Sequence, residues 1–132
     1  MYIPATSGVK VDRWDEHTYH ETSDGRKLTR ARVQQTLAGD LDGHGEAEWL
    51  MFYRPDSTAD FVGLHHFVGR IGARPGSVVL ETCGTFDGTA ATGPLRIVSG
   101  SGTDELEGIS GDGQLRAPSG GEASITLAYR FD

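Results

Sequence analysis

The sequence predicts an all-β protein, an eight-stranded antiparallel β-barrel with one short helical turn. Apolar and polar residues alternate over much of the chain, as they do in strands that bury one face. Pairs such as Asp-Gly and Pro-Gly separate these runs, as in tight hairpin turns. Because an open sheet of such long strands would expose two edges, we expect the sheet to close on itself.

The composition predicts one compact domain, residues 1–132, without nucleic acid or membrane partners. The chain carries 12 Lys and Arg against 19 Asp and Glu, and its net charge of −7 repels phosphates and anionic lipids. The single cysteine, Cys83, cannot form an internal disulfide. No apolar run has the length of a signal peptide or a membrane span. We therefore expect a cytoplasmic protein.

The turn signals set the expected strand boundaries. After a loose start at residues 1–7, strands are expected at residues 9–19, 27–40, 46–54, 59–70, 78–86, 90–98, 114–117 and 123–131. The expected turns between the first six strands are Asp24-Gly25, Asp42-Gly43, Pro55-Asp56, Pro75-Gly76 and Asp87-Gly88. Since two-residue turns fix strand register, the inward-facing residues can be followed from one strand to the next.

A glycine-rich segment, residues 99–113, interrupts the strand pattern near the end of the chain. Asp104 and Glu107 have the spacing of a capping pair, while Leu106 and Ile109 fall on one face of a helical turn near residues 104–110. A following glycine can end this turn in the left-handed conformation. We expect the segment to close one end of the barrel.

The expected register places a mostly apolar set of side chains inside the barrel. Through the Asp42-Gly43 turn it directs Glu48, Leu50 and Phe52 inward. The competing interpretation is that inside and outside are exchanged on the third to fifth expected strands, and a single bulge would invert part of the assignment. The other expected inward residues are Trp14, Glu16, Ala31, Val33, Gln35, Leu37, Phe61, Gly63, His65, Phe67, Val78, Leu80, Thr82, Phe86, Ala91, Leu95, Ile97 and Tyr129.

Glu48 and His65 form the candidate catalytic pair. In the expected register they lie diagonally across two strands, roughly 5 to 8 Å apart. An apolar lumen raises the pKa of a carboxyl group and histidine titrates near neutrality, so the pair could act as acid and base in an isomerisation or cyclisation. The alternative is a buried pair that only fixes strand order. The candidate ligand-binding residues, each also explicable as ordinary core, are Trp14, Glu16, Gln35, Phe52, Phe61, Thr82 and Tyr129.

Neither a metal nor another cofactor is expected at this site. His65 and His66 are adjacent in a predicted strand, so they point to opposite faces and cannot easily share one ion. The glycine-rich segment lacks the lysine of a phosphate-binding loop.

The outer face of the third to fifth expected strands carries more apolar surface than a solitary barrel needs. It includes Trp49, Met51, Tyr53 and Leu64 in the expected register, together with Val62, Val68 and Val79. A contiguous patch of this kind is typical of an interface. We therefore expect a homo-oligomer formed through this face.

Several motifs, taken together, resemble a bacterial domain-of-unknown-function family that is grouped with the allene oxide cyclase barrels. They cover residues 14–16, 36–43, 47–56, 61–64, 84–86 and 100–113. The resemblance implies a cofactor-free barrel from a superfamily that includes allene oxide cyclases, dirigent proteins and polyketide cyclases. The catalytic residues of allene oxide cyclase have no clear match here. The leading hypothesis is a barrel for a small apolar ligand, acting as a cofactor-free cyclase or isomerase of bacterial secondary metabolism; the alternative is a non-catalytic ligand-binding or structural oligomeric barrel.

Overall fold

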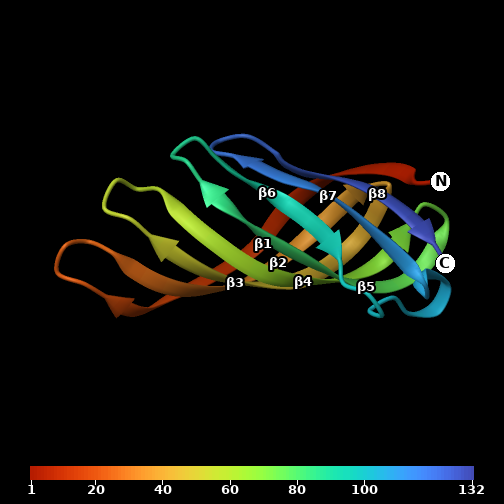
Figure 1. Ribbon diagram of the computed structural model, residues 1–132, viewed down its shortest axis with the longest axis horizontal. Helices are drawn as coiled ribbons and strands as arrows, with labels where there is room; N and C mark the ends of the chain where they lie inside the picture. Colours follow the sequence, from red (N-terminus) through yellow and green to blue (C-terminus); the bar gives the residue numbers. More distant parts are fainter.

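The computed structural model describes residues 1–132 as a closed barrel of eight antiparallel strands (Figure 1). Each strand pairs with its neighbours in the chain, and β1 closes the barrel against β8. The elements are β1 (Ile3–Glu21), β2 (Lys27–Gly39), β3 (Leu41–Tyr53), β4 (Ala59–Ile71), β5 (Arg74–Phe86), β6 (Ala90–Ile97), the 3₁₀ turn η1 (Asp104–Leu106), β7 (Ile109–Pro118) and β8 (Ala123–Phe131). The predicted all-β barrel is confirmed.

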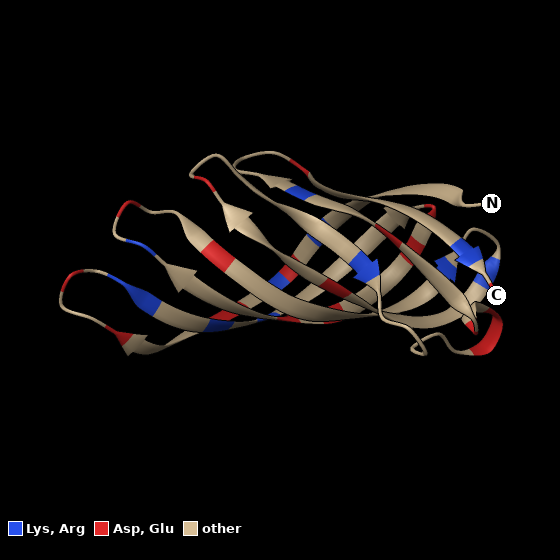
Figure 2. Cartoon of the chain, in the orientation of Figure 1, with Lys and Arg blue, Asp and Glu red and all other residues tan.

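The two ends of the barrel are built differently. The β1–β2, β3–β4, β5–β6 and β7–β8 turns gather at one end, whereas the two termini lie with the β6–β7 connection at the other (Figure 1). That connection contains η1 and forms an acidic edge of its end of the molecule (Figure 2). No helix in the structure has both the length and the apolar character needed to cross a membrane.

The β6–β7 connection closes its end of the barrel as predicted, but without the expected capping pair. Leu106 is fully buried, and Ile109 packs in the same core cluster. The residue that precedes η1 is Thr103, which makes no side-chain cap. Its hydroxyl instead accepts a hydrogen bond from the backbone N–H of Ser77 at 3.0 Å. The plug is therefore held by its apolar side chain and by bonds to β5.

A cluster of 14 buried residues fills the plugged half of the barrel. Phe67 and Leu106 are fully buried within it, and Tyr129 belongs to it as well. The opposite half, toward the four hairpin turns, is lined by a separate cluster of five buried residues on β2 and β3. The barrel thus has a solid end and a less densely filled end, which determines where a ligand could enter.

The β2–β3 turn differs from the prediction and changes the face of β3. It is centred on Asp40 rather than on Asp42-Gly43, so that Leu37 pairs with Gly43. Paired residues on the two strands therefore have numbers of the same parity, and odd-numbered residues point inward on both. The expected turn would have paired odd with even numbers. The prediction for the inner face of β3 is wrong for this reason.

The correction moves six side chains across the sheet. Glu48, Leu50 and Phe52 face outward instead of inward. Conversely, the three residues that were expected on the outer face, Trp49, Met51 and Tyr53, point into the barrel. The alternative interpretation, in which the faces are exchanged, is therefore correct for β3 alone.

The predicted inner faces of the other central strands are confirmed. The β3–β4 loop again preserves parity, so His65 and Phe67 of β4 are buried inside. The β4–β5 turn lies at Gly72-Ala73 instead of the expected Pro75-Gly76. This change moves the pairing partner of each residue by six positions along the neighbouring strand. An even shift leaves the faces unchanged. The inward residues of these strands include Ala31, Val33, Leu37, Val78, Leu80, Thr82, Leu95 and Ile97.

Strand β1 is longer than predicted and changes face along its length. Residues 1–7 were expected to be loose, but Ile3 to Val9 pair with β8 and complete the barrel. Register shifts occur at Asp12 and Tyr19, where one residue is left out of the pairing with β2. Between these bulges the even-numbered Trp14 and Glu16 face inward, as predicted.

Candidate functional site

The barrel contains an apolar cavity of about 330 Å³ in the half away from the plug. Seventeen of the 19 residues that line it are hydrophobic. Four alanines on β4, β6, β7 and β8, at positions 59, 91, 117 and 123, lie in the part nearest the hairpin turns, where their small side chains leave space. Leu37 and Leu80, which belong to the buried core, form the floor. The cavity is therefore a blind pocket that faces the end with the hairpin turns.

Aromatic side chains on the cavity wall lie over glycines of neighbouring strands. Trp49 packs against Gly63, where an added Cβ would lie less than 3.0 Å from the indole ring. Phe61 lies over Gly84 in the same way, with its Cζ 2.9 Å from the position of an added Cβ. The Trp49 and Phe61 rings meet edge to face, with centroids 5.6 Å apart. Glycine in these strands thus makes room for large inward side chains.

His65 is the one titratable group of the cavity wall apart from Tyr53. It is buried, and its Nε2 atom has no hydrogen-bond partner. The ring lies over Gly45 of β3, with Nε2 2.7 Å from the place that a Cβ would take. Burial lowers the pKa of His65 to about 4, with a smaller contribution from the neighbouring His66. The imidazole is consequently neutral at physiological pH, with one donor and one acceptor nitrogen.

A carboxylate network stands at the rim of the cavity. Glu16 accepts hydrogen bonds from the Trp14 indole at 2.9 Å, from the Thr29 hydroxyl at 2.7 Å and from the Tyr53 hydroxyl at 2.7 Å. Partial burial raises the pKa of Glu16, but these three bonds and the charge of Lys27 outweigh it, so the net pKa is lowered. Burial and the bond to Glu16 raise the pKa of Tyr53 to about 12. The rim therefore carries a fixed negative charge.

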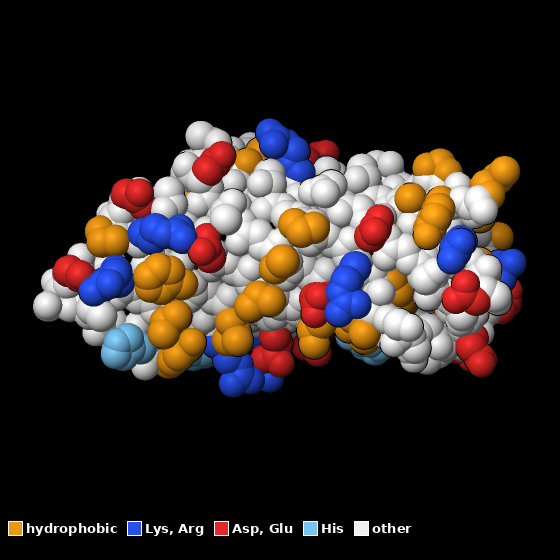
Figure 3. Space-filling model, viewed as in Figure 1, with side chains coloured by type: hydrophobic (Ala, Val, Ile, Leu, Met, Phe, Trp, Pro, Cys, Tyr) orange, Lys and Arg blue, Asp and Glu red, His pale blue; other side chains and the backbone are white.

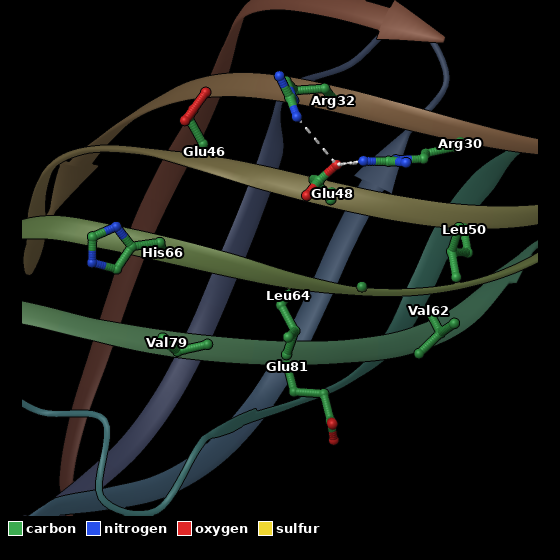
Figure 4. Close-up of a pocket in the computed structure, with 11 residues that line it drawn as sticks. Arg30, Arg32, Glu46, Glu48, Leu50, Val62, Leu64, His66, Val79 and Glu81 are labelled. Atoms are coloured by element: carbon green, nitrogen blue, oxygen red, sulfur yellow. Dashed lines mark hydrogen bonds and ion pairs between the residues drawn. The ribbon is translucent and has the colours of Figure 1, made fainter. Parts of the chain in front are cut away.

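The predicted pairing of Glu48 with His65 is wrong. Glu48 pairs with Leu64, and His65 with Ala47, so the two side chains lie on opposite faces of the sheet. Glu48 is on the outer surface, where its Oε1 lies 2.9 Å from Nη2 of Arg30 and 3.7 Å from Nη2 of Arg32 (Figure 4). The structure leaves His65 in the lumen without an acidic partner.

The other candidate residues divide into three groups. Trp14, Gln35 and Phe61 line the cavity, and Glu16 is hydrogen-bonded to residues at its rim. Thr82 and Tyr129 are buried but do not line it, since Tyr129 packs in the plugged half. Phe52 faces outward, where the Arg54 guanidinium lies 5.7 Å from its ring centroid. Its expected place in the lumen is wrong because of the β3 register.

Several cavity residues were missed because of the exchanged face of β3 or the bulge at Asp12 of β1. Trp49, Met51 and Tyr53 were assigned to the outer surface, and Val9 and Val11 were given no role. The apolar character of the alternate residues 47, 49 and 51 was a usable signal, since it favours the odd-numbered face of β3 over the face that carries Glu48.

The outer surface of β3 and β4 carries a strip of exposed apolar side chains, Leu50, Val62, Leu64 and Val68, which we call the outer strip. A space-filling view shows hydrophobic side chains gathered among charged ones on the visible face (Figure 3). Leu50, Val62 and Leu64 lie in a shallow groove bordered by the Arg30–Glu48 pair on one side and by Glu81 on the other (Figure 4). Val62, Leu64 and Val68 lie on the outer face as expected, whereas on β3 Leu50 takes the place of the expected Trp49, Met51 and Tyr53.

Comparison with known proteins adds the family of the chain. Residues 5–129 match the sequence profile of DUF3224, described as a protein of unknown function. A crystal structure of a DUF3224 protein of unknown function from Shewanella oneidensis MR-1 superposes with a TM-score of 0.86. The match is 24% identical in sequence and covers 100% of this chain and 98% of that chain, which supports the barrel fold. No curated protein matches the chain.

Proposed function

The chain belongs to the DUF3224 family, whose function is unknown, and from the lumen geometry we propose that it binds a small apolar molecule inside the barrel. The observation that carries this proposal is the blind cavity of about 330 Å³ with 17 hydrophobic lining residues. Ligand pockets begin at about 300 Å³ and are typically apolar with a few polar groups. A packed barrel of eight strands has room for side chains or for one small ligand, and here the alanines leave that room.

A binding role agrees better with the lumen than the acid–base role first expected. Isomerisation or cyclisation by a Glu48–His65 pair loses its geometric basis, because Glu48 is on the outer surface. His65 remains as a neutral polar group in the cavity, and Glu16 is held at the rim by three donors. A cytoplasmic location and kinship with the allene oxide cyclase barrels both remain predictions from the sequence.

Titration with a neutral, environment-sensitive dye tests the proposal. N-phenylnaphthylamine fluoresces strongly only in apolar surroundings, so binding in the lumen should give a saturable increase at one dye per chain. Ala91→Phe should abolish this increase, because its side chain fills the cavity from β6. Thr92→Phe is the matched control, since Thr92 is the next residue on the same strand and is exposed. Ala117→Phe fills the cavity from β7 and gives a second blocking variant.

Circular dichroism must show that both blocking variants are folded. Loss of dye binding in the folded Ala91→Phe or Ala117→Phe protein, with binding kept in Thr92→Phe, supports a lumen site. Binding that survives in both blocking variants and disappears in Leu64→Lys would place the dye on the outer strip and contradict the proposal.

The outer strip favours a second candidate role, a structural barrel that assembles with further copies of itself. Leu50, Val62 and Leu64 expose between 47% and 52% of their surface, which is unusual for a contiguous patch on a monomer. Two ion pairs border opposite sides of the groove, Arg30 with Glu48 and Arg96 with Glu81, so a two-fold related copy would meet no uncompensated like charge there. Light scattering should then give a mass of at least two chains that falls to one chain in Leu64→Lys. A wild-type monomer at micromolar concentration would remove this candidate.

A further inference from the structure

The lumen offers no charged group to a bound molecule. Besides its 17 hydrophobic residues, the wall contains only Gln35 and His65, and burial keeps His65 neutral above pH 4. A ligand carboxylate or ammonium group in this cavity would lose its water without gaining a counter-ion, which is strongly unfavourable. An uncharged ligand is therefore required.

One polar side chain in the lumen lacks a partner. His65 is 7% exposed, and its buried Nε2 atom makes no hydrogen bond. A buried polar group without a partner destabilises the protein, so a ligand group that bonds to the imidazole recovers this free energy on binding. The neutral ring carries one donor and one acceptor. A hydroxyl group can satisfy either nitrogen, because it both donates and accepts, whereas a carbonyl can only accept.

From these observations we infer that the lumen selects an uncharged, apolar alcohol or phenol, with its hydroxyl group on the imidazole of His65. This inference rests on the proposed binding function and adds the chemical class of the ligand. The edge-to-face rings of Trp49 and Phe61, with Trp14 nearer the rim, favour a flat ring as the apolar part. The size of the cavity limits that part to one or two rings with a short chain.

Displacement of bound N-phenylnaphthylamine by three matched compounds tests the inference. The compounds are para-butylphenol, butylbenzene and para-butylbenzoate, which share one shape and differ in the polar group. Near pH 7.5 the phenol is neutral and the benzoate is charged. The phenol should displace the dye at about a fivefold lower concentration than the hydrocarbon, since one net hydrogen bond is worth about a factor of five, and the charged benzoate should be the weakest.

The variant His65→Leu should reverse the order of phenol and hydrocarbon. In that variant the hydroxyl group leaves water without finding a partner, so the ratio of the two affinities should change by about tenfold in favour of butylbenzene. His66→Leu is the matched control, because His66 is the next residue on the same strand and is exposed on the outer surface, so this variant should leave the wild-type order intact.

The possible failures are distinguishable. A wild-type protein that binds the dye and all three compounds equally well keeps the lumen function but overturns the hydroxyl preference. Displacement by the benzoate at the same concentration as the phenol overturns the requirement for an uncharged ligand. A hydroxyl preference that survives in His65→Leu overturns the placement of the hydroxyl group on His65. Absence of saturable dye binding to the wild-type protein contradicts the proposed function itself.

Discussion

Trp49 of β3 lies directly over Gly63 of β4, its cross-strand partner, and fills the space that a side chain there would occupy. An added Cβ at Gly63 would also lie less than 3.0 Å from the backbone oxygen of Glu48. Gly63→Ala should therefore destabilise the protein by about 1 to 3 kcal/mol, the usual cost of overpacking. Denaturant unfolding measures this, and Gly8→Ala, where the nearest atom is 3.9 Å away, is the control that should stay close to wild type. Equal stability of the two variants would contradict the packing of Trp49 on Gly63.

Glu48→Gln should have little effect on stability and none on ligand binding. The carboxylate is half exposed and pairs with Arg30 on the outer surface, and such pairs contribute about 0 to 1 kcal/mol. Thermal unfolding measures the stability and dye titration measures ligand binding. His65→Leu, which changes a side chain inside the lumen, is the variant for comparison. A large loss of dye affinity in Glu48→Gln would restore the inward orientation of this residue that the structure excludes.

His65 should make the protein less stable as the pH falls from about 6.5 to about 4. In the unfolded chain its pKa is close to 6.5, while burial lowers it to about 4 in the folded state. Between these values the unfolded state binds more protons, so the free energy of unfolding decreases with falling pH. The total for this residue is about 3 kcal/mol. The difference between wild type and His65→Leu isolates it, because the carboxylates are common to both proteins.

Urea unfolding at several pH values between 4 and 7 is the measurement. The exposed neighbour provides a control: His66→Gln should keep most of the wild-type pH dependence. Parallel stability curves for wild type and His65→Leu would show that the imidazole is not held neutral in an apolar site.

Glu16→Gln should lower the pKa of Tyr53. Burial raises the pKa of this phenol, and the carboxylate that accepts its hydrogen bond raises it further, to about 12. A neutral amide removes the negative charge that opposes tyrosinate formation. Absorbance titration follows tyrosinate, with Tyr53→Phe identifying the contribution of this residue. Glu46→Gln on the outer surface is the matched control, and an unchanged transition in Glu16→Gln would argue against the rim network.

The fold class could be predicted from the sequence because alternation and turn signals are local. The face of β3 could not, since it depends on whether the turn is centred on Asp40 or on the Asp42-Gly43 pair, and each position has plausible turn residues. A change of parity in one turn exchanges every side chain on the strand. The inward orientation of Glu16 was nevertheless predicted, because the bulge at Tyr19 offset the error in the expected β1–β2 turn.

The candidate site shows the same limits. His65 could be placed in the lumen because two errors cancelled. The β2–β3 and β3–β4 turns each differ from the expected turn by an odd number of register positions, so the predicted face of β4 is correct. Its lack of a partner could not be foreseen, because that depends on Glu48 facing away. The cavity itself arises from four alanines on four different strands, and only the three-dimensional arrangement shows that they meet.

A crystal structure of the protein grown with para-butylphenol tests the central claim most directly. We predict one molecule in the lumen, with its ring beside Trp49 and Phe61 and its hydroxyl group within hydrogen-bond distance of the His65 imidazole. An empty lumen at saturating concentration, or a molecule bound only at the outer strip, would contradict the account.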